Sequence, residues 1–151
     1  MSKEKSVQDV EQNPQDNQPQ EHQIKEKTLY ETIGGATVIQ HLVNRFYEVM
    51  ETDPKAAEIR VMHQADLASA NEKLVMFLSG WMGGPQLYIE KYGHPRLRAR
   101  HFPFPIGEAE RNQWVYCMVR AMHDVGIEEQ LTIRLAKAFW DIADMMRNKE
   151  G

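Results

Sequence analysis

The chain has 151 residues, with 18 Lys and Arg against 22 Asp and Glu, and therefore a net charge of −4. This balance disfavours nucleic acid as a partner, because phosphates attract basic surfaces. Cys117 is the only cysteine, which excludes an internal disulfide and any cysteine-rich zinc or iron–sulfur site. No apolar run approaches the roughly 20 residues of a membrane span, so we expect a cytoplasmic protein with no membrane insertion.

Residues 1–27 are predicted to form a polar, mobile N-terminal extension. The segment is rich in Gln, Asn, Glu and Lys. Its apolar side chains are Met1, Val7, Val10 and Ile24. So little apolar surface cannot offset the entropy that is lost on ordering. A segment that folds on contact with a partner is the alternative interpretation, and residues 28–151 are expected to form the folded domain.

After this extension the apolar residues recur with the period of an α-helix. Residues 36–51 place one row of apolar side chains at i, i+4 spacing, which predicts an amphipathic helix. A second helix is expected over about residues 66–80, with Asp66 as its N-cap. Two Gly-Gly pairs are interpreted as turns. Gly34-Gly35 precedes the first helix, and Gly83-Gly84 follows the second.

The middle of the chain is irregular, and two further long helices follow it. Residues 86–92 are compatible with a short helix, whereas residues 93–107 are rich in Gly and Pro. Apolar periodicity then predicts helices over residues 108–125 and 128–147. No stretch alternates over the length of a strand. The sequence therefore predicts an all-α fold of two sequential helix pairs separated by an irregular middle.

The histidines are the first candidates for chemistry. They are His22, His41, His63, His94, His101 and His123. No two of them have the i, i+4 spacing of a helical zinc pair, and the chain has no HExxH motif and no phosphate-binding glycine loop.

His101 differs from the others by its context. It follows the basic residues Arg96, Arg98 and Arg100 and precedes Phe-Pro-Phe-Pro, within the irregular middle. A neutral imidazole beside an apolar pocket is what an axial haem ligand requires, with nearby cations available for the propionates. The residues alone leave a structural histidine with satisfied hydrogen bonds as the alternative.

Six short segments of the sequence are informative when they are considered together. They are Leu29-Tyr-Glu-Thr-Ile-Gly-Gly, Arg45-Phe-Tyr, Met76-Phe-Leu, Gly83-Gly-Pro-Gln-Leu-Tyr, Gly93-His-Pro-Arg-Leu-Arg-Ala-Arg-His-Phe-Pro-Phe and Glu110-Arg-Asn-Gln-Trp. In this order and at these intervals they resemble the truncated haemoglobins of group II, over about residues 28–146. The resemblance implies a globin-like, two-over-two helical sandwich around haem b (iron protoporphyrin IX).

The resemblance also implies roles for particular residues. His101 would be the proximal iron ligand, and Tyr47 and Trp114 would lie on the distal side, where a phenol and an indole can donate hydrogen bonds to a bound ligand. His63 stands where relatives carry Tyr or Phe and would add a second titratable donor, with Met62 as the other candidate for that position. Without the resemblance, Tyr47 and Trp114 would be interpreted as ordinary core residues.

Further residues are expected to contact the haem. They are Phe46, Ala70, Lys73, Leu74, Phe77, Leu78, Tyr88 and Arg100. Ala70 stands where larger globins carry the distal histidine, so its small side chain leaves an opening towards the iron. Lys73 matches the base that pairs with a propionate, and Arg100 and Tyr88 are further candidates for that task. An ordinary exposed lysine is the alternative interpretation of Lys73.

Three classes of function follow from these predictions. The first is a haem protein that reversibly binds dioxygen, nitric oxide and similar diatomic ligands. The second is a redox enzyme on the same scaffold that detoxifies nitric oxide, peroxide or reactive nitrogen species. It would need a separate reductase, because the chain has no flavin or nicotinamide motif. The third is a haem-free helical interaction module.

Overall fold

The structure is a computed structural model that describes residues 27–151. The predicted N-terminal extension, apart from Lys27, lies outside the described residues. The described part of the chain is helical and contains no strand, as the sequence predicts. None of the helices in residues 27–151 is long and apolar enough to cross a membrane.

The helices follow one another with short connections. They are α2 (Leu29–Ile33), α3 (Gly35–Thr52), η1 (Pro54–Ala56, a 3₁₀ turn), α4 (Ala57–Val61), α5 (Ala68–Trp81), α6 (Leu87–Tyr92), α7 (Leu97–His101), α8 (Glu108–Asp124) and α9 (Glu129–Met145). The four long helices and α6 lie close to their predicted positions. The five-residue helices α2, α4 and α7 were not predicted, because so few residues cannot display a helical period.

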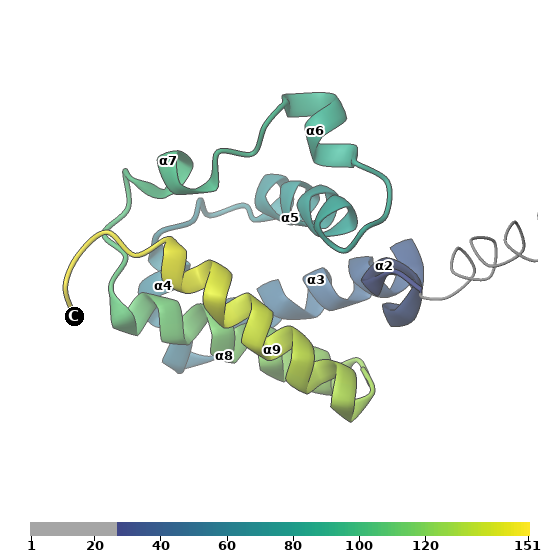
Figure 1. Ribbon diagram of the computed structural model, residues 1–151. Helices are drawn as coiled ribbons and strands as arrows, with labels where there is room; N and C mark the ends of the chain where they lie inside the picture. Colours follow the sequence, from purple (N-terminus) through teal and green to yellow (C-terminus); the bar gives the residue numbers. More distant parts are fainter. Residues whose placement is uncertain (1–26) are drawn as a thin grey trace, which may run out of the picture.

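Two helix pairs form the layers of the molecule. Helix α3 packs against α5, α8 packs against α9, and a contact between α3 and α8 joins the two pairs. In Figure 1, α6 and α7 lie along the upper edge, at the side of the molecule opposite α8. The predicted arrangement of two helix pairs around an irregular middle is therefore confirmed.

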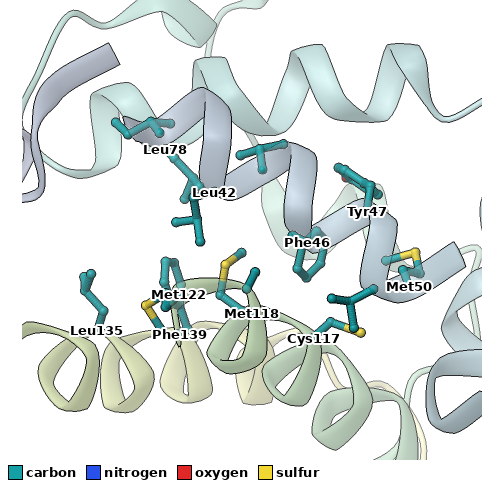
Figure 2. Packing of buried hydrophobic residues seen from close by; sticks show 14 of the residues in the cluster. Leu42, Phe46, Tyr47, Met50, Leu78, Cys117, Met118, Met122, Leu135 and Phe139 are labelled. Carbon is teal, nitrogen blue, oxygen red and sulfur yellow. The ribbon is translucent and has the colours of Figure 1, made fainter. Parts of the chain in front are cut away.

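The main core lies where α3 meets α8 and α9. Leu42 and Phe46 of α3, Met118 and Met122 of α8 and other apolar side chains of these helices are fully buried, and Figure 2 shows several of them pointing into the same interior. Burial of each such side chain stabilises the fold by roughly 1.5–3 kcal/mol. Cys117 lies in this core with 0% of its surface exposed, and burial raises the pKa of its thiol to about 11.

The start of α5 differs by one residue from the prediction. Leu67, not Asp66, occupies the N-cap position. The Asp66 carboxylate still accepts a hydrogen bond from the backbone N–H of Ala68, at 2.9 Å. The capping interaction on which the prediction rested is therefore present, and the helix begins slightly later.

Helix α2 is fastened to the end of α5. The backbone N–H of Tyr30 donates to the carbonyl of Met82 at 2.8 Å, and the Tyr30 ring lies against Gly84 so closely that a Cβ there would stand 2.3 Å from it. Only glycine allows this approach. The glycines after α5 thus end that helix and also fix the entry into α3.

Candidate functional site

A cavity of about 480 Å³ lies between the two helix pairs. This volume is typical of small-molecule and cofactor sites, which range over about 300–1,000 Å³. Helices α3, α5, α6, α7, α8 and α9 all contribute to its walls. Predicted site residues that line it are Tyr47, His63, Ala70, Lys73, Leu74, Phe77, Leu78, Tyr88, Arg100, His101 and Trp114.

Phe46 is the predicted site residue that does not line the cavity. It is fully buried, and its ring packs edge-on against Tyr47 at 4.9 Å and against Trp114 at 5.3 Å between centroids. In Figure 2, Phe46 points towards α8 whereas Tyr47 turns away from it. Phe46 therefore supports two residues of the cavity wall from behind.

His101 is the last residue of α7 and is half-buried in the cavity wall. Its Nδ1 lies 2.6 Å from the carbonyl oxygen of Leu97. A carbonyl oxygen can only accept, so Nδ1 carries the hydrogen and donates it. Nε2 then keeps a free lone pair, which is the form of imidazole that ligates a metal.

Asn148 holds the segment that carries His101. Its side-chain amide donates to the carbonyls of His101 at 3.2 Å and Phe104 at 2.8 Å, and it accepts from the backbone N–H of Ile106 at 2.9 Å. These contacts connect residues more than 40 positions apart. Sequence analysis missed Asn148, because no motif or period marks a residue at this separation.

Tyr47 and Trp114 bring hydrogen-bond donors to the cavity. Tyr47 is 8% exposed, and burial raises the pKa of its hydroxyl, which therefore stays protonated at neutral pH. The Trp114 ring lies between Phe46 and Phe139, with centroids 5.3 and 5.7 Å away. Neither the Tyr47 hydroxyl nor the Trp114 indole N–H has a hydrogen-bond partner within residues 27–151. Both donors are available to an occupant of the cavity.

His63 follows α4 and lines the cavity beside Met62. Its Nδ1 lies 2.8 Å from the carbonyl oxygen of Ile59, so Nδ1 again carries the hydrogen. Its ring stands edge-on to Tyr47 at 5.9 Å. Burial lowers the pKa of His63 most, and the charge of Arg60 acts in the same direction. At neutral pH the ring is therefore neutral and offers an acceptor at Nε2.

Lys73 and Arg100 bring positive charge to the edge of the cavity. The Lys73 ammonium lies 5.6 Å from the centroid of the Tyr92 ring, and the Arg100 guanidinium lies 5.9 Å from that of Tyr88. Arg100 also donates from Nε to the carbonyl of Pro95 at 2.8 Å, which orients its side chain. Tyr88 and Tyr92 are neighbours, with centroids 4.9 Å apart. The three predicted propionate-binding residues thus meet at one side of the cavity.

The far wall of the cavity comes from the last turns of α9 and was not predicted as part of a site. Ile142, Ala143 and Met146 line it together with Phe139. Phe139 and Ile142 belong to the apolar face by which α9 was predicted. The signal was therefore present, but a helical period indicates burial without telling whether a protein side chain or a ligand covers the face.

Comparisons with known proteins identify the relatives of this chain. The model of the family described as bacterial-like globin matches residues 28–148. The group 2 truncated hemoglobin YjbI of Bacillus subtilis is 40% identical over 102 residues, which are 68% of this chain and 74% of that protein. The group II 2-on-2 hemoglobin of the plant pathogen Agrobacterium tumefaciens superposes with a TM-score of 0.79 at 44% identity, over 84% of this chain and 98% of that one. The chain belongs to the group II truncated haemoglobins.

A third relative agrees with this assignment. The truncated oxygen-avid haemoglobin from Bacillus subtilis superposes with a TM-score of 0.74 at 37% identity, over 81% of this chain and all of that one. As a truncated haemoglobin the chain is a globin that binds haem, and the predicted all-α sandwich of the family is confirmed.

The residues that line the cavity suit a haem, independently of the comparisons with known proteins. No group of three or more His, Cys, Asp or Glu side chains in residues 27–151 could hold a metal ion. An ion bound to the free Nε2 of His101 would therefore take its other ligands from a cofactor. A porphyrin supplies these, its ring matches the largely apolar walls, and its carboxylates match the cations Lys73 and Arg100. The residues present fit the group that the family implies.

Proposed function

We propose that this truncated haemoglobin holds haem b through His101 and reversibly binds dioxygen, nitric oxide and similar diatomic ligands. One observation carries the proposal. The cavity that contains the free Nε2 of His101 also contains two hydrogen-bond donors, Tyr47 and Trp114, that have no partner within residues 27–151. When bound, haem supplies an iron with a coordination position for a small ligand and with one-electron redox chemistry.

The basic residues at the cavity edge would hold the haem in one orientation. Lys73 and Arg100 would pair with the propionates, and the Tyr88 hydroxyl would donate to the same carboxylates. Arg100 is suited to this task because its hydrogen bond to Pro95 already restricts its side chain. Ala70 and Leu74 would leave room for the porphyrin face, since their side chains are small or apolar.

The donors Tyr47 and Trp114 would slow the release of a polar diatomic ligand. A buried donor that loses its partner costs about 1–3 kcal/mol, and ligand release would leave both donors without one. His63 would compete with the ligand for the single hydrogen of the Tyr47 hydroxyl, because its Nε2 can only accept while the ring is neutral. Slow release is supported by the relative whose description calls it oxygen-avid.

A redox role is the second candidate function. Lys73 and Arg100 at the cavity edge have no carboxylate within 4 Å in the described part of the chain, and such a surface suits a separate electron donor. With a reductase, the chain would turn over nitric oxide, peroxide or reactive nitrogen species. We also include a cytoplasmic location in the proposal, because a single buried thiol and the absence of disulfides suit a reducing compartment.

The proposal is tested on the purified, haem-loaded chain by two measurements made side by side. Stopped-flow spectroscopy follows oxygen release through the Soret band, and an electrode follows nitric oxide consumption with and without a reductant. We expect a Soret band that shifts with each ligand and a slow oxygen release. Catalytic consumption of nitric oxide only with the reductant would favour the redox role. A purified chain that takes up no haem would contradict both candidate functions. It would favour the haem-free helical interaction module instead.

A further inference from the structure

The cations of this chain are not spread evenly, although its net charge is negative. We call one exposed group the basic rim. It comprises Lys73, Lys91, Arg96, Arg98 and Arg100. Within residues 27–151 none of its members lies within 4 Å of a carboxylate, and this includes the sequence neighbours Glu72 and Glu90. Arginines elsewhere behave differently, since Arg45, Arg111 and Arg120 each pair with an aspartate at 2.7–2.9 Å.

Aromatic rings contact four members of the basic rim, and Arg98 and Arg100 also donate to the backbone carbonyls of Arg147 and Pro95 at 3.4 and 2.8 Å. Lys73 and Lys91 lie 5.6 and 5.4 Å from the centroid of the same Tyr92 ring. Arg98 lies 5.5 Å from the centroid of Phe102. Such contacts orient a cation and stabilise it by about 0.5–1 kcal/mol at an exposed site, but a ring has no net charge to neutralise it. Within residues 27–151 the rim therefore presents positive charge that no direct ion pair neutralises.

The basic rim surrounds the edge of the haem cavity. Lys73 and Arg100 belong to its lining, Lys91 shares the Tyr92 ring with Lys73, and Arg98 lies on the same short helix as His101. Figure 1 places α6 and α7, which carry most of the rim, along one edge of the molecule. Haem propionates would neutralise only the two members that line the cavity. Lys91, Arg96 and Arg98 would keep their charge in the haem-loaded protein.

Exposed apolar rings lie among these cations. Tyr92, Phe102 and Phe104 are 37%, 60% and 38% exposed. Arginine and aromatic residues together are enriched in protein interfaces, where acidic residues are depleted. The composition of this surface thus favours a protein partner, and its charge favours an acidic one.

We propose that the basic rim is the docking surface for an acidic protein that donates single electrons, with an iron–sulfur or flavin centre. The inference rests on the proposed function, because it assumes a haem whose edge lies under the rim. In the transfer the donor loses one electron and the ferric haem gains it, and no bond is formed or broken. The negative charge on the rest of the chain repels an acidic protein, so it steers the donor towards the rim.

The test uses haem-loaded full-length protein in its ferric form and an acidic [2Fe–2S] ferredoxin as the probe. Calorimetry measures binding, and stopped-flow spectroscopy measures the rate constant for reduction. Lys91→Glu and Arg98→Glu each alter the rim without altering the cavity lining. Arg134→Glu on α9 is the matched control, because it makes the same charge change at an exposed residue remote from α6 and α7.

At low salt we expect each rim variant to weaken binding and to slow reduction by about five-fold or more, against less than about two-fold for Arg134→Glu. The difference should vanish near 1 M salt, where the Debye length is about 3 Å. Equal rate constants and affinities for the rim variants and the control would overturn the proposal.

Two further measurements separate this proposal from its alternatives. Photoreduced 5-deazariboflavin, a neutral reductant, should reduce all variants at the same rate, and their oxygen spectra should match. If the unaltered protein gave no spectrum of an oxygen complex, the proposed function itself would be contradicted. Co-sedimentation with phosphatidylglycerol vesicles tests a membrane as the partner. Vesicle binding that Arg98→Glu abolishes, with ferredoxin unaffected, would overturn the docking of a protein donor.

Discussion

The proposed distal donors, Tyr47 and Trp114, and the proposed proximal ligand, His101, are held by different forces. Tyr47 and Trp114 belong to helices of 18 and 17 residues, whose inner faces form the apolar core. His101 ends a helix of five residues, none of which is buried. Its position depends on hydrogen bonds to Leu97 and Asn148. Apolar burial thus fixes Tyr47 and Trp114 as firmly as the fold itself, while a few polar contacts fix His101.

This difference predicts different responses to perturbation. A helix with few buried contacts opens locally at a lower free-energy cost than the global fold. We expect α7 to be such an element and α3 to exchange its amide hydrogens only on global unfolding. Haem binding and ligand release should therefore respond to different sets of mutations.

Removal of the proximal ligand should have the largest effect. His101→Gly is expected to abolish stable haem uptake, because His94, the other histidine of the same sequence block, does not line the cavity and uses its Nδ1 to accept from the backbone of Arg96 at 3.0 Å. Absorption spectra of the purified variant measure the haem content, and added imidazole should restore it. His94→Gly is the matched control and should bind haem normally. A normal five-coordinate ferrous spectrum of His101→Gly without imidazole would show that the proximal assignment is wrong.

Deletion of the distal donors should have the next largest effect. Tyr47→Phe and Trp114→Phe are each expected to speed oxygen dissociation by about ten-fold or more, since each removes a donor worth about 1–3 kcal/mol. Stopped-flow ligand replacement measures the rate constants, with Tyr30→Phe outside the cavity as the control. The double variant should be sub-additive, because neighbouring groups couple. Unchanged rates in both single variants would contradict a hydrogen-bonded distal site.

Asn148 gives the sharpest test of how α7 is held. Asn148→Ala removes three polar contacts to the connection between α7 and α8. Hydrogen bonds contribute about 0.5–1.5 kcal/mol each, so we expect haem loss to an apoglobin acceptor to become several-fold faster while oxygen release changes little. Asn112→Ala, at an exposed site on α8, is the control. If Asn148→Ala lost haem at the same rate as the unaltered protein, Asn148 would not support His101.

The smallest expected effect is the contribution of His63 to the pH dependence of the free energy of unfolding. Its folded pKa lies below the ordinary value of 6.5, so between these two values the unfolded chain binds more protons. Stability should therefore be fully present above about pH 6.5 and should fall as the pH drops towards the folded pKa. Asp53, Asp124 and Asp144 also have lowered pKa values, but from 3.8, so their effect lies at more acidic pH.

His63→Gln isolates this contribution. Urea unfolding of the haem-loaded protein, measured at several pH values between 5 and 7 on either side of the ordinary value of about 6.5, gives the slope of stability against pH. We expect the slope to flatten in His63→Gln and to persist in His123→Gln, whose ring is exposed. Equal slopes in the two variants would show that His63 is not buried as a neutral ring.

The sequence predicts the long helices and part of the cavity lining, for a physical reason. Helical periods span many residues, and the block that ends at His101 is specific enough to mark one residue. The sequence could not indicate which nitrogen of His63 carries the hydrogen, because this depends on the carbonyl of Ile59, which the short helix α4 brings to the ring. Phe46 was expected to contact the haem but lies behind the lining, because successive residues of a helix face different directions and only Tyr47 faces the cavity.

The burial of Cys117 has a consequence for experiments on this protein. With a pKa of about 11, only about one molecule in ten thousand carries the thiolate at pH 7, and the thiolate is the form that alkylating agents and oxidants attack. The side chain lies between α3 and α8, with none of its surface exposed. Reagents such as iodoacetamide should therefore modify it only in molecules whose two helix layers have separated. The labelling rate of this one sulfur atom would report how often the interior opens, without any added probe.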